Sequence, residues 1–211
     1  TGSVAEGQQL SAVTTRTDPD TITSTLYQWL RCDNSGNDAV DIGGATQSTY
    51  QTVQADVDST IRVQITYIDG LNDTYNLISA QTAVITNVND APTVANILGN
   101  LTRNEDAAPE TISLANTFAD LDGDSLNLTV SNNNSSLVVA SLNGTDLTLT
   151  YQAHQHGSAT VTVTASDASE SVDVTFTITV NAENDALTGS VTVDGTMAQG
   201  ATLTANTSGL S

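Results

Sequence analysis

Between residues 172 and 180 the sequence reads VDVTFTITV, with an apolar side chain at every second position. The positions between them hold Asp173 and three threonines. Strict alternation of apolar and polar residues is typical of a β-strand with one buried face, because successive side chains point to opposite sides of a sheet. The stretch therefore predicts a strand that covers a core with one face and meets water with the other.

The same period of two recurs along the chain, between clusters of Gly, Asn and Asp that are typical of turns. No segment carries the apolar spacing of an amphipathic helix. These features predict an all-β chain of tandem antiparallel β-sandwiches, with Trp29 in a core. The apolar positions of the alternating stretches are Tyr27 and Trp29; Ile61, Val63, Ile65 and Tyr67; Leu126, Leu128 and Val130; Leu147, Leu149 and Tyr151; and Val161, Val163 and Ala165.

Two internal repeats divide the chain. TNVNDAP at 86–92 recurs as NAENDAL at 181–187, and GSVAEGQQLSA at 2–12 recurs as GTMAQGATLTA at 195–205. The first spacing, 95 residues, is the length of one sandwich domain. We therefore expect a first sandwich at 1–88, a second at 89–185, and the start of a further repeat of the first type at 186–211.

The stretch 187–194 has no counterpart before Thr1. We therefore expect the chain to be a fragment, with a first repeat that lacks its first strand and a third that holds only its opening. An open sheet edge invites pairing with another chain, so strand exchange between copies is one expected interaction.

Composition excludes several classes of function. The chain has four arginines, no lysine and 24 acidic residues, for a formal charge of −20, which argues against a nucleic-acid-binding protein. No apolar run approaches the roughly 20 residues of a membrane helix, so no membrane insertion is expected. The lone Cys32 cannot form an intrachain disulfide, and His154 and His156 belong to no catalytic grouping, so an enzyme is not expected.

Short motifs add a family resemblance. The second repeat resembles the cadherin-like repeats of giant bacterial surface adhesins, including those of the RTX type. The first resembles the bacterial immunoglobulin-like repeats that often alternate with them. The motifs are NDAP at 89–92, NED at 104–106, FADLDGD at 118–124, TASD at 164–167 and NDA at 184–186, and, in the first repeat, YQW at 27–29, IRV at 61–63 and YIDG at 67–70.

This resemblance implies a calcium-stiffened stalk or adhesion module, extracellular or at the cell surface, in contact with neighbouring repeats of the same protein. A surface glycan or a host or biofilm ligand is a further expected partner. The alternative from another class is a module that itself binds carbohydrate or a receptor within a larger extracellular protein.

Asp120, Asp122 and Asp124 carry the case for calcium that comes from the residues themselves. In an extended segment these alternate side chains point the same way, ~7 Å apart. Carboxylates so close repel one another unless a cation lies between them, and Ca²⁺ prefers about 6 to 8 oxygen ligands. The alternative is that these residues form turns by accepting hydrogen bonds from their own backbone.

The resemblance supplies the rest of the expected ligands. It places Asn89, Asp90, Asp120, Asp122 and Asp167 around Ca²⁺ at the first junction, and Glu105 with Glu183, Asn184 and Asp185 at the second. Weak sites, with Kd in the extracellular range of about 10⁻⁴ to 10⁻³ M, are expected.

Overall fold

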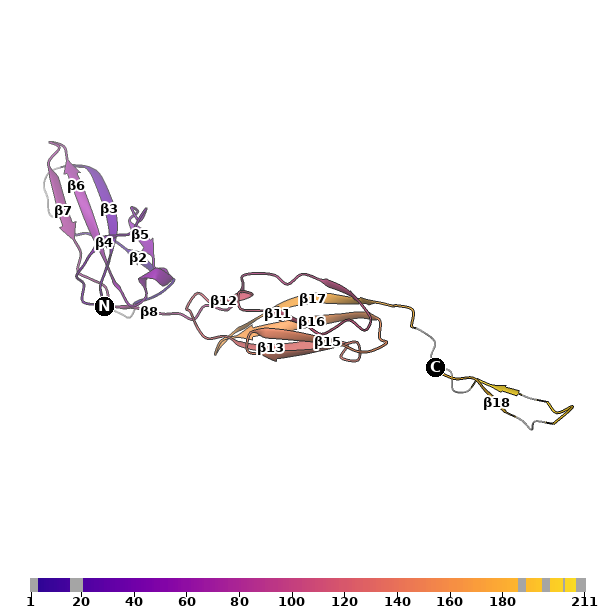
Figure 1. The fold of residues 1–211 in the computed structure, drawn as a ribbon. Helices are drawn as coiled ribbons and strands as arrows, with labels where there is room; N and C mark the ends of the chain where they lie inside the picture. The colour runs from indigo at the N-terminus through magenta and orange to yellow at the C-terminus, as the bar shows by residue number, and fades with distance from the viewer. Residues whose placement is uncertain (1–3, 16–20, 186–188, 195–197, 203, 208–211) are drawn as a thin grey trace. The chain divides into compact units, whose positions relative to one another are not determined.

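The computed structural model describes residues 4–15, 21–185, 189–194, 198–202 and 204–207, and consists of β-strands and one short 3-10 helix (Figure 1). The predicted all-β fold class is confirmed. The chain forms two compact units. Unit 1 comprises Thr1–Pro92, Asp120–Leu126 and Asp167–Glu170, and unit 2 comprises Thr93–Ala119, Asn127–Ser166 and Ser171–Ser211. No helix in the described ranges has the length and apolar character that a membrane span requires.

Unit 1 is built from short strands around one long antiparallel pair. β3 and β6 form the middle of a four-stranded antiparallel sheet of order β4-β3-β6-β7. β2 pairs with β5 in an antiparallel ladder, and β1 pairs with β8 in parallel. The elements are β1 (Val4–Ala5), β2 (Gln9–Ser11), β3 (Ile22–Cys32), β4 (Val40–Asp41), β5 (Thr49–Gln51), the 3-10 helix η1 (Gln54–Asp56), β6 (Thr60–Asp69), β7 (Thr74–Ile78) and β8 (Ile85–Thr86).

The core of unit 1 follows the predicted alternation. From Ile61 onward every second side chain of β6 is buried, and the buried set includes Ile61, Val63, Ile65 and Tyr67. Trp29 on β3 lies in the same core, and its indole Nε1 donates a 2.9 Å hydrogen bond to the carbonyl oxygen of Gln47. The prediction that Trp29 is a core residue is therefore confirmed.

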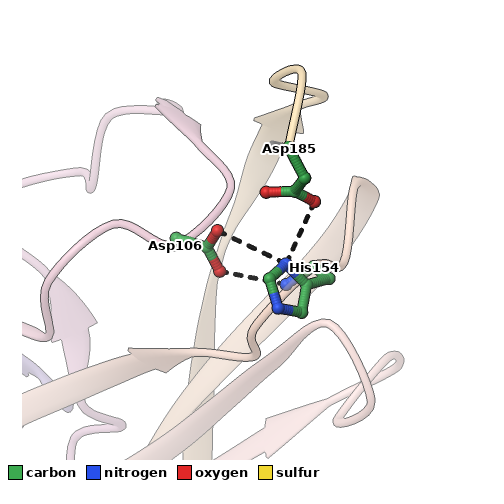
Figure 2. Close-up of side chains that lie close together, drawn as sticks. All are labelled: Asp106, His154 and Asp185. Atoms are coloured by element: carbon green, nitrogen blue, oxygen red, sulfur yellow. Dashed lines mark hydrogen bonds and ion pairs between the residues drawn. The ribbon is translucent and has the colours of Figure 1, made fainter. Parts of the chain in front are cut away.

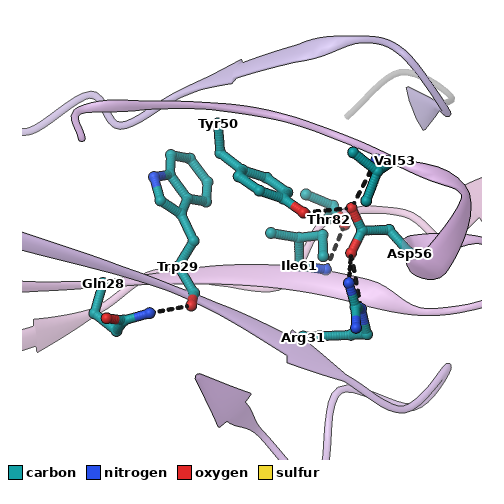
Figure 3. Close-up of polar contacts among 8 residues, drawn as sticks. All are labelled: Gln28, Trp29, Arg31, Tyr50, Val53, Asp56, Ile61 and Thr82. Carbon is teal, nitrogen blue, oxygen red and sulfur yellow. Dashed lines mark hydrogen bonds and ion pairs between the residues drawn. The ribbon is translucent and has the colours of Figure 1, made fainter. Parts of the chain in front are cut away.

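A fully buried carboxylate, Asp56, holds the end of this sandwich together (Figure 3). Its Oδ2 accepts hydrogen bonds from the hydroxyl of Tyr50 (2.7 Å) and the backbone N–H of Val53 (2.9 Å). Its Oδ1 accepts from Nε (2.8 Å) and Nη2 (2.6 Å) of Arg31. A buried charge is tolerated only with such pairing, so Asp56 fixes η1 to β3 and β5.

Unit 2 contains a four-stranded sheet of order β10-β17-β16-β13, in which only β10 and β17 run parallel. A second, antiparallel sheet has the order β11-β15-β14, and β9 pairs with β12. The strands are β9 (Thr93–Val94), β10 (Leu101–Asn104), β11 (Glu110–Ser113), β12 (Phe118–Ala119), β13 (Asn127–Asn132), β14 (Val138–Asn143), β15 (Asp146–Tyr151), β16 (Gly157–Ser166) and β17 (Ser171–Asn181).

The strand predicted at 172–180 is β17, and it packs as its sequence predicts. Val174, Phe176, Ile178 and Val180 are buried, whereas the threonines between them face outward or lie at intermediate depth. β16 supplies alternate buried residues from the neighbouring strand, and Leu147 and Leu149 of β15 cover the core from the second sheet. The two sheets thus enclose one apolar layer, as in an antiparallel sandwich.

The C-terminal segment forms a separate antiparallel pair between β18 (Thr192–Asp194) and β19 (Thr204–Asn206). Val193 lies opposite Ala205 in this pair. The residues of β19 are exposed, and Val191 and Val193 are among the exposed large apolar residues of the chain.

Candidate metal site

Two overlapping groups of carboxylates lie together in unit 1. Glu6, Asp90 and Asp122 each offer one oxygen within 4.8 Å of the others, and so do Asp120, Asp122 and Asp124. Asp122 belongs to both groups. Both loops that carry the expected aspartates, Asp120–Leu126 and Asp167–Glu170, form part of unit 1 together with the linker residues Asn89 and Asp90.

The loop from Asp120 to Asp124 is folded by its own first carboxylate. Oδ1 of Asp120 accepts the backbone N–H of Asp122 at 2.9 Å and that of Asp124 at 3.3 Å. Gly123 adopts a φ of 77°, a left-handed conformation that glycine reaches without steric cost. Asp120 is therefore a turn former through Oδ1, which leaves its second oxygen for another partner.

Asp122 divides its two oxygens in the same way. Oδ2 accepts a 2.6 Å hydrogen bond from the backbone N–H of Asp90. Oδ1 is buried and has no hydrogen-bond partner. One oxygen of Asp122 is therefore held by a long-range backbone hydrogen bond, and the other is left for the metal interpretation.

Asp167 closes its own turn and contacts the linker. Its Oδ1 accepts the backbone N–H groups of Ser169 and Glu170, and its Oδ2 accepts Nδ2 of Asn89 at 3.2 Å. The hydrogen bonds from Glu170 and Ser169 lower the pKa of Asp167, so its carboxylate form is favoured.

The strongest indication of a cation site is a set of buried oxygens. Four of the six buried side-chain nitrogen or oxygen atoms without a hydrogen-bond partner in the described ranges belong to this site. Burying a polar group without a hydrogen-bond partner costs ~2–7 kcal/mol, and burying an unpaired charge costs more. The four atoms are Oε2 of Glu6, Oδ2 of Asp90, Oδ2 of Asp120 and Oδ1 of Asp122.

The charges around these atoms point the same way. Burial raises the pKa of Glu6, and the nearby carboxylates of Asp90 and Asp122 raise it further. None of the ion pairs found in the described ranges brings an arginine or a histidine to these residues. The site therefore concentrates negative charge and hard oxygen atoms, which fits Ca²⁺.

The residues expected at the second junction lie in unit 2. The buried side chain of Glu105 accepts the backbone N–H of Glu183 at Oε1, and its Oε2 lies 3.8 Å from Nδ1 of His156. Asp185 lies against a different histidine: its Oδ2 is 3.0 Å from Nδ1 of His154. Asn184 is exposed.

His154 also contacts Asp106, and Figure 2 shows Nδ1 of its ring facing the carboxylates of both Asp106 and Asp185. Nδ1 of His154 lies 3.6 Å from Oδ2 of Asp106, and its backbone N–H donates to Oδ1 of Asp106 at 3.0 Å. The structure thus places Glu105 beside Glu183 and His156, and Asp185 beside Asp106 and His154.

Sequence reasoning missed Glu6, although a signal was present. Glu105, near the start of the second repeat, was assigned to the junction at that repeat's end. Glu6 holds the equivalent place near the start of the first repeat, and the same argument would have assigned it to the junction at 89–90. For His154, in contrast, no pattern in the sequence indicated a neighbour 31 residues away.

Comparison with known proteins gives one family match. Residues 89–181 match a family model described as "Bacterial Ig domain", a type of domain that usually occurs in extracellular proteins. The search of curated proteins found no match.

Several solved structures are similar to parts of this chain. Human mucin-like protocadherin EC1-2 is 13% identical, with 86% of this chain and 95% of that chain covered and a TM-score of 0.42. Drosophila OTK extracellular domains 3-5 are 13% identical, with 92% and 66% covered and a TM-score of 0.39. The endo-fucoidan hydrolase MfFcnA4 of glycoside hydrolase family 107 is 16% identical, with 78% and 27% covered and a TM-score of 0.34.

This chain spans only 27% of the fucoidan hydrolase. Because all three TM-scores are below 0.5, the fold assignment rests on the chain's own strand topology.

The family match extends from the linker through β17 and includes Asn89, Asp90, Asp120, Asp122 and Asp167. The family model describes an immunoglobulin-like domain, whereas the sequence motifs of the same residues resemble cadherin-like repeats. Both kinds of domain are antiparallel β-sandwiches. Residues 89–181 are therefore similar to the bacterial Ig domain family, over a match that covers less than half of the chain.

Proposed function

We propose that the chain is a calcium-stiffened segment of a bacterial surface or secreted adhesin, built of repeats at 1–88, 89–185 and 186–211, and acts as a stalk or adhesion module. The observation that carries this proposal is the group of four buried, unpartnered carboxylate oxygens of Glu6, Asp90, Asp120 and Asp122. A divalent cation supplies the partner that all four lack.

Calcium is the cation that this donor set favours. All candidate ligands are oxygen atoms, from carboxylates and from the amide of Asn89, with no thiol and no imidazole in the group. Glu6, Asn89, Asp90, Asp120, Asp122 and Asp167 would hold the ion. When bound, Ca²⁺ would neutralise carboxylates that otherwise repel one another.

Stiffening follows from where the ligands sit along the chain. The loop Asp120–Leu126 lies in unit 1 but connects β12 to β13 of unit 2, and the turn Asp167–Glu170 connects β16 to β17. A bound ion would hold these two segments against Glu6 and Asp90, and so would restrict the motion of both connections. At a net charge of −20, a stalk without the ion would remain flexible through self-repulsion.

We extend the proposal to a second calcium site that uses Glu105, Asn184 and Asp185. Glu105 is buried, and it is already fixed by the backbone of Glu183. In the surface protein that we propose, this segment contacts neighbouring repeats of the same chain. The whole adhesin binds a surface glycan or a host or biofilm ligand.

Thermal unfolding with and without calcium tests the proposal. For a Kd of about 10⁻⁴ to 10⁻³ M, 10 mM Ca²⁺ stabilises the folded chain by about 1.4 to 2.7 kcal/mol. For a domain of roughly 100 residues, each kcal/mol added to the free energy of unfolding raises Tm by about 4–8 °C. We expect this rise in the wild-type chain and its loss in the double variant Asp120→Asn, Asp122→Asn.

The matched control is the double variant Asp41→Asn, Asp146→Asn, which removes two charges at exposed positions outside the site. It should keep the full calcium-dependent rise in Tm. Equal Tm values in calcium and in chelator for the wild-type chain would overturn the calcium proposal and favour a ligand-binding module instead.

A further inference from the structure

Three side chains from separate segments of unit 2 meet at one point (Figure 2). Asp106 follows β10, His154 lies in the connection between β15 and β16, and Asp185 follows β17. One ring nitrogen of His154 and one carboxylate oxygen of each aspartate lie within 4.8 Å of one another. The fold thus brings an imidazole and two carboxylates together from parts of the chain that are 31 and 48 residues apart.

The ring nitrogen that faces both aspartates cannot satisfy both of them. Nδ1 of His154 lies 3.0 Å from Oδ2 of Asp185 and 3.6 Å from Oδ2 of Asp106. An imidazole nitrogen carries at most one proton, and 3.6 Å is longer than a hydrogen bond. Among the described residues, no arginine forms an ion pair with either aspartate. A metal ion in the place of that proton would bind all three atoms at once.

The distances suit a small tetrahedral ion. Zn²⁺ binds imidazole nitrogen at about 2.0–2.1 Å and carboxylate oxygen at about 2.0–2.2 Å, so two of its ligand atoms lie ~3.4 Å apart. The separations of 3.0 and 3.6 Å from Nδ1 of His154 lie on either side of that value. Ca²⁺ prefers about 6 to 8 oxygen ligands, whereas imidazole is a common ligand of Zn²⁺. The nitrogen in this group therefore favours zinc.

The backbone positions two of the three ligands. The backbone N–H of His154 donates a 3.0 Å hydrogen bond to Oδ1 of Asp106. Hydrogen bonds to the outer oxygen of a ligating carboxylate fix its orientation in metal sites. Asp106 thus has one oxygen held by the backbone and the other, Oδ2, directed to Nδ1 of His154.

A buried carboxylate from the same segments supplies independent evidence for a cation. The side chain of Glu105, the residue before Asp106, is only 4% exposed. Its Oε1 accepts the backbone N–H of Glu183, but its Oε2 lies 3.8 Å from Nδ1 of His156, which is beyond hydrogen-bond distance. An ionised oxygen in such a buried position is unfavourable without a close partner. This end of unit 2 therefore holds more negative charge than its two imidazoles neutralise.

We propose that Asp106, His154 and Asp185 bind Zn²⁺, with water in the fourth position that a zinc ion with three protein ligands keeps. The ion would join the β10–β11 connection, the β15–β16 connection and the segment after β17. Asp106 and His154 belong to neither calcium set described above, so the proposal does not depend on calcium. Asp185 alone is shared with the second calcium site, and the two ions would compete for it.

Calorimetric titration with Zn²⁺ tests the site in the full chain, prepared without a polyhistidine tag. Millimolar Ca²⁺ is present throughout, so that sites built only of oxygen ligands are occupied by calcium. We expect one zinc ion to bind per chain, and His154→Asn to weaken the binding by roughly 10- to 100-fold or more. Asparagine readily adopts the φ of 57° found at His154, so this variant should fold.

His156→Asn is the matched control, because His156 belongs to the same connection but lies outside the group of three. It should keep the zinc affinity of the wild-type chain. Absence of zinc binding by the wild type, or equal affinities of the wild type and His154→Asn, overturns the proposal. A greater loss in His156→Asn than in His154→Asn would move the ion to Glu105 and overturn this ligand set.

NMR spectroscopy of the ring nitrogens identifies the ligand atom, because the chain has only two histidines. We expect Zn²⁺ to shift the Nδ1 signal of His154 and to leave the signals of His156 in place. A shift of Nε2 in place of Nδ1, or equal shifts of both histidines, overturns the proposed coordination.

Asp106→Asn separates the zinc proposal from the calcium proposal. Asp106 has a φ of 60°, which asparagine also adopts, and it belongs to no proposed calcium set. The variant should bind Zn²⁺ roughly 10- to 100-fold more weakly and keep the calcium-dependent rise in Tm. Unchanged zinc affinity in Asp106→Asn overturns the zinc site, whereas failure of the calcium proposal leaves this measurement unaffected.

Discussion

The backbone N–H of Asp90 donates a 2.6 Å hydrogen bond to Oδ2 of Asp122, a residue 32 positions further along the chain. The second oxygen of Asp122 is buried without a partner, and Asp122 belongs both to the group with Glu6 and Asp90 and to the group with Asp120 and Asp124. The backbone thus holds Oδ2 of Asp122 and leaves Oδ1 of the same side chain for a cation. The first prediction concerns Glu6, which lies in the same group.

Glu6→Gln is expected to change stability in opposite directions with and without calcium. In chelator the substitution removes a charge that Asp90 and Asp122 repel, so the free energy of unfolding should rise. In calcium the same substitution removes a charged ligand, so the affinity for Ca²⁺ should fall by about tenfold. Chemical unfolding in both conditions and calorimetric titration with Ca²⁺ measure the two effects.

Glu170→Gln is the control for this prediction, because Glu170 is an exposed glutamate of the same unit that bonds Asp167 only through its backbone N–H and carbonyl oxygen. It should leave calcium affinity unchanged. A Glu6→Gln chain that is destabilised equally in calcium and chelator would show that Glu6 acts through packing and not as a ligand.

Asp56 provides a second prediction that is independent of any metal. Asp56→Asn keeps the shape of the side chain but removes the charge that pairs with Arg31 and accepts from Tyr50. We expect a loss of about 2–3 kcal/mol in the free energy of unfolding, less than for a fully buried pair because the side chain of Arg31 is 34% exposed.

Urea unfolding measures the effect of Asp56→Asn against Asp58→Asn. Asp58 is exposed and has a φ of 63°, a conformation that asparagine tolerates, so its substitution should be close to neutral. Equal stabilities of the two variants would contradict a structural role for the buried carboxylate.

The pH dependence of stability supplies a third prediction. Burial raises the pKa of Tyr50 to about 12, and the hydrogen bond to Asp56 contributes in the same direction. In the unfolded chain tyrosine ionises near pH 10, so the unfolded state loses its proton first as the pH rises. The stability that protonated Tyr50 contributes is therefore complete below about pH 10 and is lost as the pH rises through about 12.

Unfolding experiments between pH 9 and 12 check this sign, using Tyr50→Phe as the comparison. The variant lacks the titrating hydroxyl, so its stability should decline less steeply over this range than that of the wild-type chain. Burial also raises the pKa of Tyr151, which donates to Glu110, so some decline should remain in Tyr50→Phe. Parallel curves for the two proteins would contradict the assignment to Tyr50.

The strand pattern was predictable because it is local. The alternation of Val174, Phe176 and Ile178 fixes which side of β17 is buried whatever the strand pairs with, and the buried residues of β6 follow the same rule. Trp29 was predictable for a related reason, since a lone tryptophan in a sandwich strand is usually a core residue.

The contacts of the candidate site were less predictable because they join distant parts of the chain. The spacing of Asp120, Asp122 and Asp124 indicates a cluster, but only the fold brings Glu6 to Asp122. Nor does the sequence reveal that Oδ1 of Asp120 serves a turn while its Oδ2 is left without a partner, since that division depends on backbone geometry. The pairing of His154 with Asp185 has the same origin in tertiary structure.

The fourth prediction concerns stiffness itself. Spin labels at the exposed residues Asn37 in unit 1 and Ser141 in unit 2, in a Cys32→Ala background, report the spread of distances between the two units. Because calcium would fix Asp122 and Asp90 together, the distance distribution measured by pulsed electron resonance should narrow when Ca²⁺ replaces chelator. The double variant Asp120→Asn, Asp122→Asn should keep the broad distribution in both conditions. A wild-type distribution of equal width with and without calcium, in a chain whose Tm still rises with the ion, would show that calcium stabilises the fold without stiffening the segment.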